Sequence, residues 1–269
     1  MTDYQRPRGI DLDKPNAARV YDYLIGGKLN YAVDRMFADQ VMGVLPNARH
    51  MAVTNRKWLR RAVRFGAEQG IRQFLDIGSG MPTAGHVHEV VQAVDPRCTV
   101  VYVDIEPIAV AHSKIVLEDN ERTAMVQADG TDPYGVLEHP ATNQLLDLNA
   151  PLMVVMAAFV HFIPDERNPA GMIAAYRRAM APGSYLALSS GTFDGQGEDV
   201  ARRAAELYRT NGTSVFPRSR DELRALTDGF EIVPPGIVYT SHWRPDVTGT
   251  DPHPHPHKES QLALVGRKK

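Results

Sequence analysis

The spacing of apolar residues changes about a quarter of the way along the chain. Before that point, apolar residues recur every three or four positions, first from Ala17 to Leu24 behind Asn16, a plausible N-cap. The same spacing covers about residues 33–43 and 49–70. This part of the chain is therefore predicted to be a set of amphipathic helices.

The rest of the chain begins with short continuous apolar runs that alternate with helical patterns. The expected strands are residues 73–77, 99–105, 124–129, 152–157 and 185–190, and the helices between them are 83–94, 107–120 and 165–180. Continuous apolar strands are typical of a sheet covered on both faces. Strands alternating with helices predict an α/β fold with a parallel, doubly wound sheet.

The C-terminal part is predicted to add two helices and a hairpin. Helical patterns lie near residues 199–209 and 219–227, and strand candidates cover 230–239 and 261–265. The segment DPHPHPHKES, which precedes the last strand, reads as a loop or a long hairpin connection. We expect one folding unit, made of an arm and helical cap over residues 1–70 and an α/β core over residues 71–269.

Composition narrows the class of protein. The chain has 269 residues, 43% of them hydrophobic, and a formal net charge of -2, so nothing global attracts it to nucleic acid or to an anionic membrane. The start has no apolar signal segment, and the most apolar stretch, residues 151–162, is too short to span a bilayer. Its one cysteine, Cys98, excludes an internal disulfide and a multi-cysteine zinc site. We expect a cytoplasmic protein.

Histidines at three alternate positions in the loop at 253–257 are the one metal-like pattern. His253, His255 and His257 each follow a proline. Histidine-rich tracts can bind metal, but alternation with proline indicates an exposed, extended loop. No metal site is expected.

A glycine turn follows the first expected strand. The segment LDIGSG places Asp76 two positions before Gly78, with Gly80 next and Pro82 where a third alternating glycine would stand. Such a turn brings a ligand close to the backbone. In an open α/β sheet, ligands bind outside the carboxyl ends of the strands.

The next two strands also end in acids, Asp104 and Asp129. A carboxylate at the end of the second strand can accept hydrogen bonds from ribose hydroxyls, which fits any adenosine-bearing cofactor, nicotinamide dinucleotides included. A dinucleotide requires G-x-G-x-x-G and free N–H groups at the helix start. Here Thr83 occupies the third glycine position, and Pro82 donates no N–H. The turn therefore does not suit pyrophosphate.

Taken together, these segments resemble the class I S-adenosylmethionine-dependent methyltransferases. The resemblance covers about residues 71–267 and lies in LDIGSG, VYVDIEP and VQADGTDP; residues 21–31, YDYLIGGKLNY, further resemble the N-terminal signature of an uncharacterised bacterial methyltransferase family. It implies a Rossmann-like, seven-stranded, mostly parallel sheet with a C-terminal antiparallel hairpin. It also implies S-adenosylmethionine as cofactor.

The resemblance assigns a role to each matching residue. Asp76 and the backbone of Gly78, Ser79 and Gly80 are expected to hold the methionine part of the cofactor. Asp104 is expected to bind the ribose hydroxyls, and Ile105 to pack on one face of adenine. Asp129 and the backbone of Gly130 are expected to bind the adenine amino edge. Ala157 and Ala158 are expected to face the methyl donor. Pro82 departs from the pattern and affects the path of the methionyl tail.

Each of these residues also has a purely structural interpretation. The glycines could form a simple strand-to-helix turn, Asp104 could cap the next helix, and Asp129 could be a turn residue. Three acids at successive strand ends favour cofactor binding for the set.

Three further residues are candidates for the site. His161 is either a general base or a histidine that hydrogen-bonds to backbone and packs between Phe159 and Phe162. Tyr23 lies off the apolar stripe of its helix, and the resemblance favours a lid over the methyl donor. Arg56 is the member of a basic stripe over residues 56–64 that we expect to reach the cofactor carboxylate, whereas the stripe itself is expected to be a solvated helix face.

The sequence thus predicts methyl transfer to an oxygen or nitrogen of a small molecule, with the helical cap closing over the acceptor. A non-catalytic sensor or accessory protein that binds S-adenosylmethionine or S-adenosylhomocysteine is one alternative, and an NAD-dependent oxidoreductase is another. Methylation of RNA or protein ranks lower, because no docking surface is evident. No oligomeric state is predicted.

Overall fold

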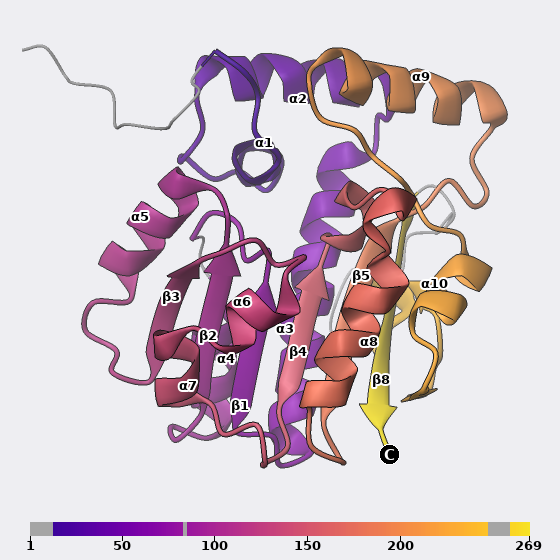
Figure 1. The fold of residues 1–269 in the computed structure, drawn as a ribbon. Helices are drawn as coiled ribbons and strands as arrows, with labels where there is room; N and C mark the ends of the chain where they lie inside the picture. The colour runs from indigo at the N-terminus through magenta and orange to yellow at the C-terminus, as the bar shows by residue number, and fades with distance from the viewer. Residues whose placement is uncertain (1–12, 83–84, 247–258) are drawn as a thin grey trace, which may run out of the picture.

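A computed structural model describes residues 13–82, 85–246 and 259–269 (Figure 1). One sheet runs through it in the order β3-β2-β1-β4-β5-β8-β6, and β7 also pairs with β8. The parallel strands are β1 (Gln73–Ile77), β2 (Thr99–Asp104), β3 (Thr123–Gln127), β4 (Met153–Ala157) and β5 (Tyr185–Gly191). β8 (Gln261–Lys268) runs antiparallel to β5. The predicted mostly parallel α/β fold is confirmed.

The strand predicted over residues 230–239 is divided in two. Instead of one strand over residues 230–239, the chain forms β6 (Phe230–Ile232) and β7 (Val238–Tyr239), each antiparallel to β8. Pro234 and Pro235 lie between them. Proline has no N–H for the ladder, so a continuous strand cannot pass through this pair. The predicted hairpin is therefore two short strands on one long strand.

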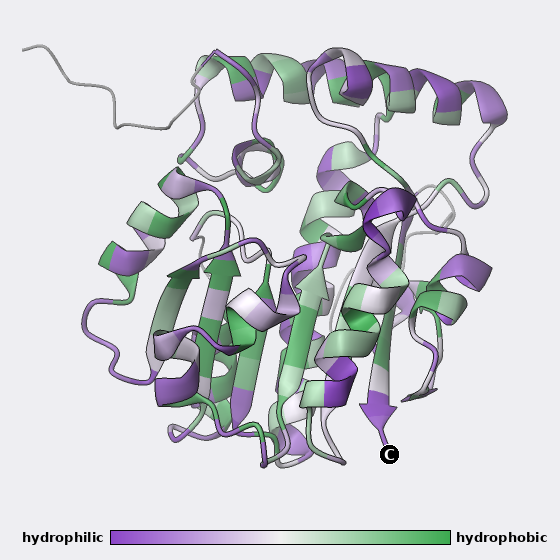
Figure 2. Ribbon diagram, in the orientation of Figure 1, coloured by the Kyte–Doolittle hydropathy of each residue, from purple (hydrophilic) through white to green (hydrophobic). Residues whose placement is uncertain are grey.

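Helices cover both faces of the sheet, because successive strand residues point to opposite sides. Phe74 belongs to the core cluster with residues of α3, α4 and α5 on one face, whereas Leu75 and Ile77 belong to the cluster with residues of α6, α7, α8 and α10 on the other. Figure 2 shows the strands as predominantly hydrophobic. The bounds are α3 (Ala48–Glu68), α4 (Val87–Val94), α5 (Pro107–Val116), α6 (Pro133–Leu137), α7 (Pro140–Leu145), α8 (Pro169–Ala179) and α10 (Arg220–Leu226).

Some helix boundaries differ from prediction. The helix expected from residue 83 begins at Val87, and residues 83–84 lie outside the described part. The helix expected from residue 165 begins with a 3₁₀ turn, Asp165–Arg167, and becomes α8 after Asn168, a left-handed residue. Among the described residues, no helix combines the length and apolar character that crossing a membrane requires.

Three helices lie across the carboxyl ends of the parallel strands and form what we call the roof (Figure 1). They are α1 (Ala17–Leu24), α2 (Ala32–Val44) and α9 (Glu198–Thr210). Val20, Phe37 and Val41 belong to their shared core, and the rings of Phe37 and Tyr208 meet edge to face at 5.1 Å. The roof thus joins the N-terminal helices to a helix from the C-terminal half.

The basic stripe on α3 is not uniformly solvated. Lys57, Arg60 and Arg64 are exposed, but Arg61 is buried and donates hydrogen bonds to the carbonyl oxygens of Trp243 and Thr240. The prediction of a solvated face is wrong for Arg61, because α3 packs against both the sheet and the segment after β7.

Candidate functional site

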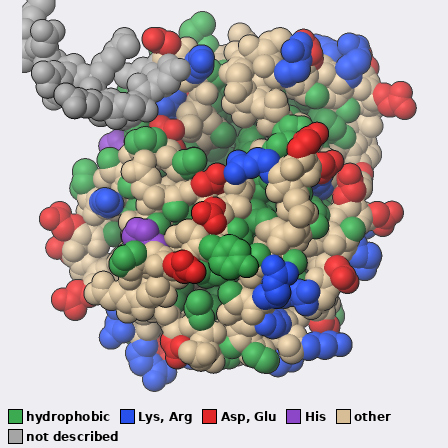
Figure 3. All heavy atoms as spheres, viewed as in Figure 1, with side chains coloured by type: hydrophobic (Ala, Val, Ile, Leu, Met, Phe, Trp, Pro, Cys, Tyr) green, Lys and Arg blue, Asp and Glu red, His purple; other side chains and the backbone are tan. Residues whose placement is uncertain are grey.

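A cavity of about 360 Å³ lies between the roof and the carboxyl ends of the strands. Its lining contains every sequence-predicted site residue except Tyr23: Arg56, Asp76, Gly78, Ser79, Gly80, Asp104, Ile105, Asp129, Gly130, Ala157, Ala158 and His161. In Figure 3, acidic and basic side chains are mixed over the middle of the face seen there. The structure therefore brings together residues that are up to 105 positions apart, from Arg56 to His161.

The glycine turn after β1 has the backbone form that the motif predicts. Gly78 and Gly80 have φ of 72° and 70°, the left-handed region that side chains disfavour. A Cβ on Gly78 would lie 2.6 Å from the Phe159 ring. Hydrogen bonds to β2 also fix the turn: the N–H groups of Gly78 and Ser79 both donate to the carbonyl oxygen of Val103, at 2.8 and 3.1 Å.

Asp104 joins this turn to the end of β2. Its carboxylate accepts hydrogen bonds from the N–H of Gly80 at 2.7 Å and of Glu106 at 2.9 Å. Burial raises the pKa of Asp104, and the backbone donors oppose that rise. The carboxylate is therefore fixed at the strand ends, beside the glycine turn.

Asp76 and Arg56 are charged groups without protein partners. Asp76 is 3% exposed, and its carboxylate makes no hydrogen bond to any described residue. The Arg56 Nε is buried and has no hydrogen-bond partner among them either. Burial raises the pKa of Asp76 to about 7; Arg56 lowers it and Asp104 raises it further. Unpaired buried charges are costly, so the two groups are suited to a ligand that carries both signs of charge.

Asp129 is held by partners that no local pattern reveals. One carboxylate oxygen accepts from the N–H and hydroxyl of Thr131, at 2.9 and 2.6 Å, and the other accepts from Arg167 at 2.9 Å. Burial works against ionisation, but these donors outweigh it and hold the pKa of Asp129 below its usual value. Arg167, 38 positions away, was not among the predicted site residues.

A chain of hydrogen bonds connects the end of β4 to the roof. Ala158, which has an unusual φ of 54°, donates its N–H to the hydroxyl of Ser189 at 3.0 Å. Ser189 donates to the Asn55 side chain at 2.7 Å, and the Asn55 amide donates to the Tyr21 hydroxyl at 3.1 Å. Because strained backbone persists only where its surroundings determine it, this chain fixes Ala158 at the cavity wall.

The structure places Tyr21 in the cavity wall instead of Tyr23, which corrects the sequence prediction. The Tyr23 hydroxyl donates to Asp39 at 3.3 Å, and its ring lies 5.4 Å from the Arg49 guanidinium. The apolar stripe of α1 faces both the core of the roof and the cavity beneath it. A residue off that stripe, such as Tyr23, therefore points away from the cavity.

His161 lines the cavity, but its geometry does not fit a general base. Its Nδ1 accepts a hydrogen bond from the N–H of Gly191 at 3.1 Å, so the neutral ring carries its proton on Nε2. Burial lowers the pKa of His161 to about 4, and Arg218 lowers it further. We therefore propose that at neutral pH His161 is a hydrogen-bond donor and not a general base. Its ring packs on Phe162 at 4.4 Å, as the structural interpretation expects.

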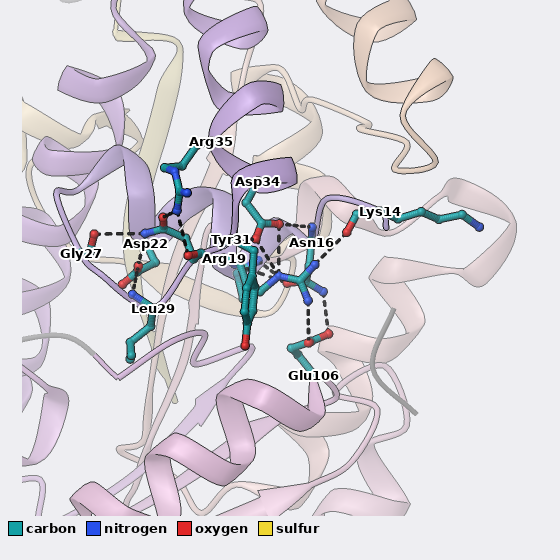
Figure 4. A network of polar contacts seen from close by, with 12 residues as sticks. Lys14, Asn16, Arg19, Asp22, Gly27, Leu29, Tyr31, Asp34, Arg35 and Glu106 are labelled. Carbon is teal, nitrogen blue, oxygen red and sulfur yellow. Dashed lines mark hydrogen bonds and ion pairs between the residues drawn. The ribbon is translucent and has the colours of Figure 1, made fainter. Parts of the chain in front are cut away.

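A buried ion-pair network fastens the roof to the turn after β2 (Figure 4). The Arg19 Nε donates to both oxygens of Asp34, at 2.9 and 3.1 Å, and an Nη of Arg19 donates to Glu106 at 3.3 Å. Asn16 donates to the other Glu106 oxygen at 2.7 Å. We call this network the Arg19 clamp. Since Glu106 follows Asp104 by two positions, the clamp ties the roof to the expected ribose site.

Comparison with known proteins agrees with this geometry. The family model for S-adenosyl methyltransferase matches residues 3–269. The crystal structure of a candidate methyltransferase from Thermobifida fusca YX has a TM-score of 0.91 and 40% identity, with 99% of both chains covered. That of a DUF574 family protein from Streptomyces avermitilis MA-4680 has a TM-score of 0.90 and 37% identity, covering 96% of this chain and 99% of that one. No curated protein matches. The chain therefore belongs to the S-adenosyl methyltransferase family of enzymes.

Proposed function

We propose that this enzyme transfers the methyl group of S-adenosylmethionine to an oxygen or nitrogen atom of a small molecule. The observation that carries the proposal is a pair of ionisable side chains in one cavity that have no hydrogen-bond partner among the described residues: Asp76, which is buried, and Arg56, whose Nε is buried. The methionyl end of the cofactor is a zwitterion. Its ammonium group suits Asp76 and its carboxylate suits Arg56.

The other cavity residues suit the adenosine end. Asp104 is available to the ribose hydroxyls, and Asp129 with the Gly130 backbone to the adenine amino edge. Ile105 is 64% exposed, which is unusual for isoleucine and suits contact with one face of adenine. Ala157 and Ala158 leave space at the end of β4 for the methyl donor.

The chemistry requires positioning more than proton transfer by the protein. When bound, S-adenosylmethionine supplies an electrophilic methyl carbon on a sulfonium. The cavity residues hold the acceptor in line with that carbon, and the roof excludes water. Positioning of this kind is worth about 7–11 kcal/mol of barrier.

Enclosure by the roof supports a small acceptor. α1, α2 and α9 cover the strand ends, so a molecule that reaches the end of β4 must enter the cavity. The formal net charge of -2 gives no general attraction to nucleic acid.

Isothermal titration calorimetry tests the proposal. We expect S-adenosylmethionine and S-adenosylhomocysteine to bind, and NAD not to bind. Asp104→Asn is expected to weaken binding by about 10–100-fold, because it removes charged hydrogen bonds to ribose. Asp147→Asn, an exposed aspartate near the opposite end of β1, is the matched control. Binding of NAD without binding of S-adenosylhomocysteine would overturn the proposal.

A further inference from the structure

The two ends of the cavity differ in charge. The carboxylates that line it belong to α1 and to the strand ends: Asp22, Asp76, Asp104, Glu106 and Asp129. The lining from α2, α9 and the segments after β4 and β5 includes Phe37, Val41, Phe162, Phe193 and Tyr208; among the described residues it contains no Asp, Glu, Lys or Arg. We call this second end the acceptor chamber.

Aromatic side chains shape the acceptor chamber. The edge-to-face pair of Phe37 and Tyr208 joins α2 to α9, and Phe162 packs against the His161 ring. Walls of this kind bury flat apolar molecules and hold them in a defined orientation. The body of the acceptor is therefore expected to be apolar and to contain a ring.

Three of the neutral polar groups in the lining of the chamber are hydrogen-bond donors that a ligand can use. The Tyr208 hydroxyl has no hydrogen-bond partner among the described residues, and burial raises the pKa of Tyr208 to about 12, so it stays protonated. The Gln261 side chain is 5% exposed, and its amide nitrogen is buried without a partner. The Nε2 of His161 carries a proton, as its bond from Gly191 requires. All three can donate a hydrogen bond to an oxygen.

We propose that the acceptor is an apolar, ring-bearing molecule with an acidic hydroxyl group, phenolic, enolic or carboxylic, which it presents to Tyr208 and Gln261 as an oxyanion. The inference rests on the proposed function and selects oxygen over amine nitrogen. A cationic amine would meet no carboxylate in the chamber. Asp22, the roof's carboxylate in the cavity, belongs to the other end. Its Oδ2 accepts hydrogen bonds from Leu29 and Asn30, both at 2.8 Å, and its Oδ1, which has no hydrogen-bond partner among the described residues, lies beside Gly27.

Such an acceptor needs no protein base. The hydroxyl must be acidic enough to lose its proton to bulk water before binding, as a carboxylic acid, an acidic enol or an electron-poor phenol does; an ordinary phenol, with a pKa of about 10, does not meet this condition. The acceptor oxygen then forms a bond to the methyl carbon, the bond from that carbon to sulfur breaks, and the electron pair stays on sulfur as a neutral thioether. Charge balances, because an anion and a sulfonium cation give two neutral products.

Three probes with one ring system test the inference: 2-naphthoate, 2-naphthamide and 2-naphthylmethylammonium. Each is titrated by fluorescence into the full chain saturated with S-adenosylhomocysteine. We expect 2-naphthoate to bind about tenfold more tightly than the amide, and the ammonium probe to bind most weakly. Equal or tighter binding of the ammonium probe, or no binding of 2-naphthoate, would overturn the inference.

Tyr208→Phe keeps the ring contact with Phe37 and removes only the hydroxyl. It is expected to weaken 2-naphthoate binding by about three- to tenfold and to leave binding of S-adenosylhomocysteine unchanged. Tyr134→Phe, at an exposed tyrosine outside the cavity, is the matched control. Unchanged naphthoate affinity in Tyr208→Phe would contradict the assignment. If S-adenosylhomocysteine itself fails to bind, the proposed function fails, and the probes titrated into the protein alone still test the chamber.

Discussion

At the scale of single residues, Asp76 couples stability to ligand binding. Burial raises its pKa to about 7 in the folded protein, from an ordinary value near 3.8. The folded state therefore binds this proton more tightly than the unfolded state. The contribution of the bound Asp76 proton to the free energy of unfolding is therefore complete below about pH 4. It is lost as the pH rises towards 7.

Asp76→Asn is expected to stabilise the ligand-free protein at neutral pH, because the amide does not ionise. The advantage over wild type should grow by about 2 kcal/mol between pH 5 and pH 7 and then level off. Denaturant unfolding at several pH values measures it, with Asp147→Asn as the control. An advantage independent of pH would contradict the burial argument. The same variant should lose about tenfold or more in affinity for S-adenosylhomocysteine.

His161 gives a second residue-scale prediction. Its ring should be neutral, with the proton on Nε2, at every pH above about 5.5, since its pKa is about 4. Nitrogen-15 NMR of the histidine rings, with His161→Gln to assign the signal, reports both tautomer and charge. A midpoint between pH 6 and 7, or a proton on Nδ1, would restore the general-base hypothesis.

At the scale of elements, the roof helix α1 depends on polar contacts. It has 8 residues, too few for an isolated helix to be stable in water. Arg19 is 1% exposed and Asp34 is fully buried, so the Arg19 clamp places charges where water cannot solvate them. Removing one partner would leave the other buried and unpaired.

Arg19→Ala is therefore expected to destabilise the protein by about 3 kcal/mol or to open the roof locally. Hydrogen exchange should show faster exchange across α1 and the start of α2, while β1 and β4 keep their protection. Arg19→Lys should not restore protection, because one ammonium group cannot reach Asp34, Glu106 and the carbonyl of Lys14 together, as the Nε and the two Nη atoms of Arg19 do. Arg203→Ala, on the exposed face of α9, is the control. Unchanged exchange in α1 would show that the clamp does not hold the roof.

The elements also show what local sequence can predict. Strands such as residues 73–77 were predictable because both of their faces are buried. The positions of the acids at the strand ends follow from the predicted strands. Arg167 beside Asp129, and Arg19 beside Glu106, are 38 and 87 positions from their partners. Contacts at that distance depend on how elements pack, which no local spacing encodes. The position of α9 in the roof is likewise not encoded locally, because it depends on the contact of Tyr208 with Phe37. The break at Pro234-Pro235, by contrast, has a local cause that the sequence contains.

At the scale of the whole molecule, the cavity joins distant parts of the chain. We propose that residues 1–70 and 71–269 form one folding unit, because α3 packs directly on β4, β5 and β8. A ligand that contacts both the strand ends and the roof should stabilise the whole chain.

S-adenosylhomocysteine at 100 times its dissociation constant is expected to raise the free energy of unfolding by about 2.7 kcal/mol. The ligand should move one unfolding transition of the whole chain to a higher temperature. A chain with two independent units would instead show two transitions, of which only one would move. Calorimetric scans with and without the ligand measure this, and NAD at the same concentration is the control. Two transitions, of which only one responds, would contradict the single unit.

The most direct test of the central claim is a crystal structure of the full chain with S-adenosylhomocysteine. We expect both ribose hydroxyls within hydrogen-bond distance of the Asp104 carboxylate, the amino group at Asp76 and the ligand carboxylate at Arg56. Ligand density outside this cavity, or density inside it that contacts none of these three side chains, would contradict the claim.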